Sequence, residues 1–326
     1  MIRYWIRTVV ALTCLLLAPS GDVLAQSGYP DRPIRILYGF PPGSDLMARV
    51  VADKLASVLG KPAVVENLTG AAGGIAADRT AKAAPDGYTV GILTGANIVI
   101  NGSLYAKLPY DPLKDLKPVA QLWGYPNVLY VSNDVPAKTV QEFLAHAKAN
   151  PGKVSYAHSG LGTTQHLGGE LLKLRAGVDL QQIPYRGPPQ IVTDLTSGRI
   201  SMAFLNPGVN LALAREGKIR ALAVTSRMRV PFAADLPTMI ESGFPDFDFT
   251  PWFGAFVPAG TPQPIVDRLS KEIGQILAQT DVRKKLEDLD LVSLFRGPEE
   301  LAATISTEAP YWARMIKELG IPQIDQ

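Results

Sequence analysis

Short apolar runs alternate with amphipathic segments along most of the chain. The short runs are rich in β-branched residues, as buried strands are. Between them, apolar residues recur at intervals of three and four, which indicates helices. The order strand, helix, strand, helix predicts an α/β protein built from parallel sheets with right-handed crossovers. Strands are predicted at 33–38, 63–65, 89–93, 128–131, 154–157 and 252–257.

Capping residues define several helices more closely. The helix at 46–58 ends before Gly60, which stands where a terminating glycine belongs. Thr139 and Glu142 have the spacing of a capping box for a helix that runs to Ala149. The segments 264–277 and 298–319 have a proline near the first turn and an apolar stripe, so they are predicted to pack on the core. Further helices are predicted at 75–84 and 167–174.

Four turns rich in glycine or proline stand where predicted strands end. They lie at 39–45, 69–74, 94–97 and 158–166. Ligands of parallel sheets bind beyond the carboxyl ends of the strands. A helix that starts there presents unpaired N–H groups and a positive dipole end, which favour a carboxylate or phosphate without Arg or Lys. We therefore expect an anion-binding cleft, although each turn taken alone also fits an ordinary strand-to-helix connection.

The first 25 residues are interpreted as an export signal that is cleaved near Ala25. Arg3 and Arg7 precede an apolar run at 9–17, which is shorter than the roughly 20 residues of a membrane-spanning helix. Cys14, the only cysteine, lies in this leader, so the exported chain has no thiol for disulfides or thiolate catalysis. The residues after the leader are more numerous than those that usually fold around a single hydrophobic core, so two lobes are predicted.

Charge and histidine content argue against two classes of protein. The chain has 32 Lys and Arg against 30 Asp and Glu, for a formal net charge of +2, and the charges are scattered rather than gathered in a basic stripe. This balance is not typical of a nucleic-acid binder. The three histidines, His146, His158 and His166, are too few for a metal site without added carboxylates, so no metal is expected.

Motifs for catalysis and nucleotide binding are incomplete. After Gly160 and Gly162, a dinucleotide fingerprint needs glycine at position 165, which is Gln165. The chain has no P-loop motif, and Ser159 is not in a Gly-x-Ser-x-Gly elbow. We expect no cofactor and no enzymatic activity. An exported hydrolase using Ser159 with His158 or His166 stays open as an alternative of another class.

Several short phrases, in this order and spacing, resemble the Bug family, the TctC-like extracytoplasmic solute receptors of tripartite tricarboxylate transporters. They stand at 29–34, 64–67, 70–74, 84–89, 109–112, 150–152, 184–187, 222–226, 235–238 and 252–254. The resemblance implies a two-lobed periplasmic-binding-protein fold (type II, Venus flytrap) with the ligand cleft between the lobes. It places the first lobe at 26–125, the second at 126–248 and a return to the first at 249–326.

The resemblance also implies a function. Such receptors capture a small organic carboxylate in the periplasm and deliver it to the permease subunits of the transporter, and they are monomers without cofactors. A receptor that feeds a sensor kinase is the alternative within this class. Dicarboxylates, tricarboxylates and aromatic carboxylates all remain candidate ligands, because recognition by backbone groups leaves few side chains to interpret.

Ligand contacts are carried over from the family by position. The matching residues of the first lobe are Phe40, Pro41, Gly43, Ser44, Asp45, Ala72, Gly73, Thr94 and Asn97, and those of the second are Ser159, Gly160, Gly162, Thr163, His166 and Asn206. Beyond these matches, Tyr38 is a candidate for an aromatic wall, and Arg186 is either a contact to a distal carboxylate or a solvated turn residue. The first loop is about two residues shorter than the family pattern, which is expected to enlarge the cleft or remove backbone donors. Asn206 replaces a common Asp, which permits a dianionic ligand.

Overall fold

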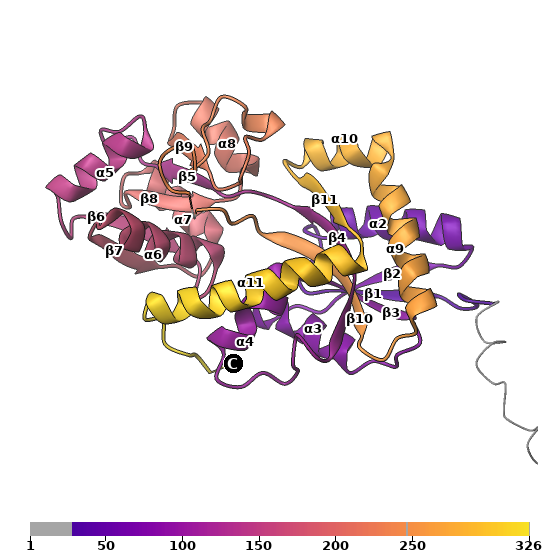
Figure 1. Cartoon of the computed structure of the whole chain (residues 1–326). Helices are drawn as coiled ribbons and strands as arrows, with labels where there is room; N and C mark the ends of the chain where they lie inside the picture. The colour runs from indigo at the N-terminus through magenta and orange to yellow at the C-terminus, as the bar shows by residue number, and fades with distance from the viewer. Residues whose placement is uncertain (1–27, 246, 326) are drawn as a thin grey trace, which may run out of the picture.

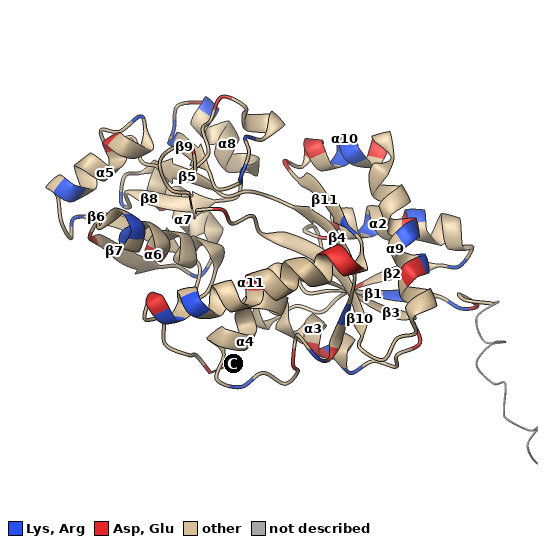
Figure 2. Ribbon diagram, viewed as in Figure 1, with Lys and Arg blue, Asp and Glu red and all other residues tan. Residues whose placement is uncertain are grey.

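The computed structural model describes residues 28–245 and 247–325, and it contains two β-sheets with helices packed on their faces (Figure 1). The predicted signal peptide at 1–25 lies outside the described residues. No helix within the described ranges is both long enough and apolar enough to cross a membrane. Positions of Lys and Arg alternate with positions of Asp and Glu along the helices of both sheets (Figure 2).

The first sheet has six strands in the order β11-β4-β10-β3-β1-β2. Its strands are β1 (Ile34–Tyr38), β2 (Ala63–Asn67), β3 (Thr89–Thr94), β4 (Leu116–Gly124), β10 (Trp252–Pro258) and β11 (Val292–Arg296). Strands β2, β1 and β3 are parallel, as predicted, but β10 runs antiparallel to β3 and β4. The expectation of a purely parallel sheet is therefore wrong. The reason is that β10 enters from the other sheet and not through a crossover helix.

The second sheet has five strands in the order β7-β6-β8-β5-β9. They are β5 (Val128–Val131), β6 (Val154–His158), β7 (Leu180–Pro184), β8 (Met202–Leu205) and β9 (Arg220–Val224). β6 is parallel to β7 and β8, whereas β5 is antiparallel to β8 and β9. This sheet is also mixed, because β5 is the strand that arrives directly from the first sheet.

Helices cover both sheets. Those of the first sheet are α2 (Leu46–Leu59), α3 (Gly74–Ala81), α4 (Asn101–Leu104), α9 (Gln263–Ala278), α10 (Thr280–Asp288) and α11 (Pro298–Glu318), with the short turns η2 (Ala71–Gly73) and η3 (Ala96–Ile100). Those of the second are α5 (Val140–Ala149), α6 (Thr164–Ala176), α7 (Pro188–Thr196) and α8 (Gly208–Arg215), with the short turn η4 (Pro231–Ala233). Every helix predicted from periodicity is confirmed within a few residues.

The two predicted caps take the expected positions. Gly60 ends α2 in the left-handed conformation, with φ at 70°. Thr139 caps α5 by accepting a hydrogen bond from Glu142 N at 3.1 Å. The Glu142 carboxylate reaches Lys138 N and not the Thr139 amide of an ideal capping box.

The chain crosses between the sheets twice, and the two crossings are joined. It leaves the first sheet after Gly124, and it returns at Trp252. Thr225 Oγ1 accepts from Asn127 N at 2.9 Å in the outward crossing and donates to Phe249 O at 2.8 Å in the returning one. Helix α11 runs alongside both the first-sheet half and the second-sheet half of the molecule (Figure 1). Its Trp312 packs edge-on against the Phe249 ring. These contacts hold the two crossings together.

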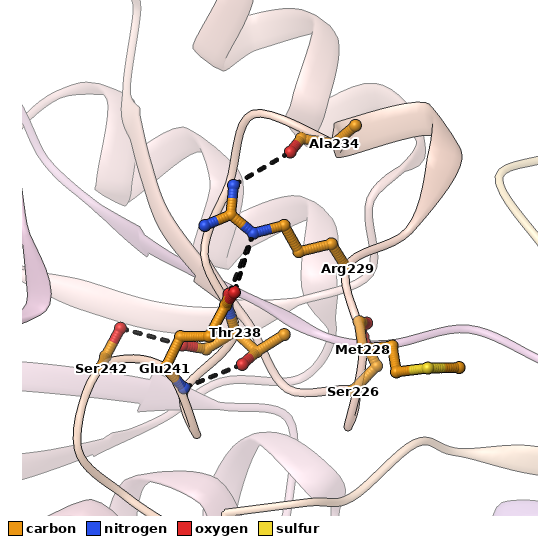
Figure 3. Close-up of polar contacts among 7 residues, drawn as sticks. All are labelled: Ser226, Met228, Arg229, Ala234, Thr238, Glu241 and Ser242. Atoms are coloured by element: carbon orange, nitrogen blue, oxygen red, sulfur yellow. Dashed lines mark hydrogen bonds and ion pairs between the residues drawn. The ribbon is translucent and has the colours of Figure 1, made fainter.

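Polar side chains fix the loop at 226–242 that follows β9 (Figure 3). Arg229 Nε donates to both oxygens of Glu241, at 3.1 and 3.0 Å, and Arg229 Nη1 donates to Ala234 O at 3.2 Å. Ser226 Oγ donates to Met228 O at 2.7 Å. The loop therefore presents Met228 to solvent in a fixed position, with 76% of the residue exposed.

Met228 is expected to be the first methionine that peroxide oxidises. The other methionines of the described ranges are buried, at 3% exposure or less, and sulfoxide formation follows exposure. Peptide mass mapping during a peroxide titration measures the order of oxidation. Met228→Leu should remove the early sulfoxide and leave the thermal unfolding curve unchanged; early oxidation of Met47, Met202, Met239 or Met315 would contradict the prediction.

Candidate functional site

Three of the predicted loops meet at one edge of the first sheet. Gly39 follows β1 so close to the second loop that a Cβ placed on it would lie 2.5 Å from Gly73 Cα. A Cβ on Gly73 would in turn lie 3.0 Å from Asn97 Oδ1 and 3.5 Å from the Phe40 ring. The structure therefore brings together Phe40, Gly73 and Asn97, which the sequence placed on three separate turns.

Asn97 joins the second and third loops by hydrogen bonds. Its Nδ2 donates to Ala72 O at 3.1 Å, and its Oδ1 accepts from Thr94 Oγ1 at 2.7 Å and from Thr94 N at 3.2 Å. Ala71 and Ala72 have φ of 47° and 50°, a left-handed conformation that is costly for residues with a Cβ. Such strain persists only where the surroundings fix it, which is typical of ligand-binding loops.

The first loop is shaped by the Asp45 carboxylate. Asp45 is 3% exposed; its Oδ1 accepts from Gly43 N at 3.0 Å and its Oδ2 pairs with Arg49 at 2.6 Å. Burial raises the pKa of this carboxyl, but hydrogen bonds from Arg49, Asn67 and Gly43 outweigh burial and hold the pKa below its usual value. Asp45 thus positions the loop with both oxygens already engaged.

The remaining residues of the first loop support the same turn. Ser44 Oγ donates to Pro41 O at 2.6 Å, and Tyr38 OH donates to Ser44 O at 2.9 Å. Asp45 does not accept from the first amides of α2. The N–H groups of Leu46 and Met47 have no protein acceptor within the described ranges, so this helix end keeps its anion-binding capacity.

Replacing Asp45 by Asn is expected to lower the free energy of unfolding by about 1–2 kcal/mol at pH 7, since the buried charged hydrogen bonds are lost. The matched control is Asp288→Asn, which breaks an exposed i,i+4 pair with Lys284 and should change stability by less than about 0.5 kcal/mol. Urea unfolding measures both. Folding lowers the pKa of Asp45. The contribution of Asp45 to the free energy of unfolding is therefore present above its pKa in the unfolded state, and it is lost as pH falls through its pKa in the folded state. The difference between wild type and Asp45→Asn should therefore shrink toward pH 3, and a constant difference would contradict this account.

Aromatic rings continue the wall behind the first loop. Phe253 on β10 stacks on Tyr38 with ring centroids 5.9 Å apart, and it lies 6.1 Å from Phe40 and 5.9 Å from Trp123. Only Phe40 is half-buried, whereas the other three rings are buried. Sequence reasoning missed Phe253, although its place in the apolar run at 252–257 is a signal for a buried strand.

The second-lobe loop between β6 and α6 uses most of its own donors. Thr163 caps α6, as predicted, by accepting from His166 N at 3.3 Å. Ser159 N and Ser159 Oγ both donate to Gln165 Oε1, at 2.9 and 2.6 Å. The amides of Leu161, Thr164 and Gln165 have no protein acceptor in the described part of the chain. These three amides, at a helix N-terminus, remain for a ligand.

The amides of Gly160 and Gly162, which were predicted as ligand contacts, donate to histidines in this structure. Gly160 N donates to His158 Nδ1 at 3.1 Å, and Gly162 N donates to His166 Nδ1 at 3.2 Å. Their φ values of 137° and 75° lie in the region that favours glycine. The two glycines therefore shape the loop, and their amides are engaged by histidines.

The second-lobe loop contacts helix α4 of the first lobe. A Cβ on Gly162 would lie 2.0 Å from Leu104 Cδ2, at the end of α4. Leu104 is held in turn by the C-terminal segment, because Ile324 N donates to Leu104 O at 3.0 Å and Ala106 N donates to Ile324 O at 3.1 Å. The contact places the Gly-rich loop of the second sheet against the edge of the first.

Two predicted residues follow β7 and β8, the strands on either side of β6 and parallel to it, so they lie at the same edge of the second sheet as the loop after β6. Arg186 is exposed in the turn before α7, and Asn206 is exposed after β8, where its backbone O accepts from Asn210 Nδ2 at 2.9 Å. Within the described ranges, no hydrogen bond or ion pair joins either residue to the loops above. Their role as ligand contacts stays a prediction.

A groove elsewhere in the first lobe and a possible metal site were the other candidates for a functional site. A groove of about 790 Å³ lies between α4, the segment 105–115 and α11, and none of the predicted site residues lines it. Within residues 28–245 and 247–325, no group of three or more His, Cys, Asp or Glu side chains could hold a metal ion.

The sequence matches the model of a known protein family. The model of the family described as the tripartite tricarboxylate transporter family receptor, TctC, matches residues 47–321. The chain belongs to the TctC receptor family. The resemblance stated from sequence phrases is therefore confirmed.

Solved relatives of the TctC family share the fold. Rpa4515 of R. palustris, solved with adipate, is 32% identical with a TM-score of 0.79, covering 91% of this chain and 100% of its own. The periplasmic binding protein BugD is 33% identical with a TM-score of 0.76, with coverage of 91% and 100%. MatC from Rhodopseudomonas palustris, solved with malate, is 32% identical with a TM-score of 0.74, with coverage of 88% and 100%. These relatives confirm the two-lobed periplasmic-binding-protein fold.

Proposed function

We propose that this TctC-family protein is a periplasmic receptor that captures a small organic dicarboxylate between its two lobes and delivers it to the permease of a tripartite tricarboxylate transporter. The observation that supports this most is the contact of Gly162 with Leu104. It brings the Gly-rich loop of the second lobe against helix α4 of the first lobe, and each lobe has a helix N-terminus with unpaired amides, at α2 and at α6. Such amides suit carboxylate oxygens.

The proposed ligand is a diacid because each lobe offers its own group of donors. We assign one carboxylate to the amides of Leu161, Thr164 and Gln165, and the other to the α2 end and the second loop of the first lobe. Adipate and malate, which are bound in two solved relatives, each carry two carboxylates. A diacid that bridges the lobes stabilises the closed form, since only contacts to both lobes differ between open and closed states.

We propose the lobe limits 26–125, 126–248 and 249–326, with Thr225 at the hinge. The outward and returning links between the sheets fall at these limits, and Thr225 bonds to both. We further propose that the leader is cleaved near Ala25 on export and that a single copy of the chain acts as the receptor.

We infer that the protein binds its ligand without chemical conversion. The hydrolase alternative needs Ser159 Oγ to donate to a histidine, but Ser159 Oγ donates to Gln165 Oε1. Neither His158 nor His166 directs its Nδ1 at this serine, because both Nδ1 atoms accept from glycine amides.

Isothermal titration of the purified protein tests the proposal. Aliphatic diacids from malate to adipate, citrate, terephthalate and glutamate are titrated separately, with hexanoate and dimethyl adipate as controls that lack one or both carboxylates. We expect binding of at least one diacid and none of dimethyl adipate. Tight binding of terephthalate would indicate a preference for aromatic ligands, and the half-buried Phe40 is the ring that we would expect such a ligand to contact. Absence of binding by every carboxylate would contradict the proposal.

The partner is tested in cells that lack the receptor. We expect uptake of the labelled diacid to be lost and then restored by the wild-type gene. Unchanged uptake together with loss of a transcriptional response to the diacid would instead assign the receptor to a sensor kinase.

A further inference from the structure

Two buried histidines lie side by side behind the second-lobe loop. The ring centroids of His158 and His166 are 4.9 Å apart, and the residues are 1% and 3% exposed. His158 is the last residue of β6, and His166 lies in the first turn of α6, so regular structure fixes both rings. Together they flank the loop that carries the unpaired amides.

Hydrogen bonds determine which ring nitrogen carries the proton. The Nδ1 atoms of His158 and His166 accept from Gly160 N and Gly162 N, so neither Nδ1 is protonated. Both rings are therefore neutral with the proton on Nε2. His158 Nε2 lies 2.8 Å from Gln182 Nε2, and a proton on this ring nitrogen requires the Gln182 amide to be turned so that its oxygen accepts.

The Nε2–H of His166 remains available. In the described part of the chain it has no protein partner, and it is not one of the fully buried polar atoms without a partner, so it reaches solvent. It belongs to the same helical turn as the unpaired amides of Thr164 and Gln165. His166 and these amides are thus within one helical turn of each other.

Few charges face the pair. Glu170 and Lys173 on α6 form an ion pair at 3.0 Å, and Tyr156 on β6 donates to Glu170 Oε1. The loop and β7 contribute the neutral side chains of Ser159, Thr163 and Gln182. Burial lowers the pKa of His158, and burial together with His158 lowers that of His166 to about 4, with Lys173 lowering and Glu170 raising it slightly.

We propose that His166 donates its Nε2–H to the bound carboxylate and that ligand binding brings a proton from solvent onto Nδ1 of the same ring. This inference rests on the proposed function. A carboxylate beside His166 favours the cationic imidazole. The added proton removes the acceptor of Gly162 N–H, so the loop releases this amide toward the ligand. The receptor would then gain a charged donor and one more amide only when a ligand is present.

The sign of the pH dependence follows by linkage. The pKa of His166 is about 4 in the free protein and higher in the complex. Affinity should therefore rise as pH falls from 7.5 through the pKa of His166 in the complex. It should level off below the pKa of His166 in the free protein. One linked proton allows at most a tenfold gain per pH unit, so we expect about three- to tenfold tighter binding at pH 5.5 than at pH 7.5.

Titration of the purified protein with adipate tests this, in two buffers of different ionisation enthalpy at pH 6.0. We expect net proton uptake for the wild type and less uptake for His166→Gln, and comparing the two removes the titration of adipate itself. His146→Gln is the matched control and should behave as the wild type. Equal proton uptake by the wild type and His166→Gln would overturn the inference. Absence of binding by every diacid would instead overturn the proposed function.

Nitrogen-15 spectra of the ligand-free wild type at pH 7.5 give a test that needs no ligand and uses variants only for assignment. The three histidines are assigned with the single Gln variants. We expect the Nε2–H form for His158 and His166, and a proton on Nδ1 of His166 would overturn the inference.

Discussion

Replacing Gly162 by alanine is expected to weaken diacid binding about 10- to 100-fold. The new Cβ would lie 2.0 Å from Leu104 Cδ2, and the Leu104 side chain has little room to recede because it is buried in the hydrophobic core. The loop must therefore move away from the first lobe, which removes contacts that a bridging ligand needs. Overpacking of this kind costs about 1–3 kcal/mol, and each 1.4 kcal/mol is a factor of ten in Kd. Isothermal titration with the diacid that binds the wild type measures the change.

The matched control separates the clash from backbone strain. Gly177, at the other end of α6, has φ of 60°, and a Cβ added to it would have no atom within 4 Å. Gly177→Ala should lose stability from strain alone and keep the wild-type Kd. Adding Leu104→Ala to Gly162→Ala should restore part of the affinity, because the atoms that clash are gone. Wild-type affinity in Gly162→Ala would mean that the two loops do not close on the ligand together.

Local elements of this fold could be predicted from sequence because their signals are local. The apolar spacing of α2 and the Thr139 cap of α5 lie within a few residues of the structure that they specify. Strand direction is different. The antiparallel course of β5 and β10 depends on how the chain passes between sheets, and periodicity reports burial but not the partner strand. Helix α10 was not predicted, since only Val282 and Leu286 of its nine residues are buried.

The candidate site was predictable to the level of loops. Glycine and proline mark turns, and these turns hold Ala72, Asn97 and Thr163 as predicted. The contact between Leu104 and Gly162 is tertiary and leaves no pattern along the chain. The hydrogen bonds of His158 and His166 could not be predicted, because the sequence does not reveal which ring nitrogen accepts a loop amide.

Gly39→Ala is expected to separate the first and second loops and to lower both stability and affinity. A Cβ on Gly39 would lie 2.5 Å from Gly73 Cα, and backbone cannot give way as a side chain does. We expect the free energy of unfolding to fall by about 1–3 kcal/mol and Kd to rise at least about tenfold. Urea unfolding and diacid titration measure the two effects. Gly28→Ala, with no atom within 4 Å of the added Cβ, should change neither.

The balance of the two effects shows what the close approach of Gly39 to Gly73 does. Gly73 also lies beside Asn97 and the Phe40 ring, so a shift of this turn moves the strained Ala72 amide and the aromatic wall together. A rise in Kd for the folded variant, in addition to the fall in the free energy of unfolding, would mean that the close approach of Gly39 to Gly73 sets the geometry of the ligand site. Loss of stability with unchanged Kd would restrict Gly39 to folding and would place the diacid contacts of the first lobe at the α2 end instead.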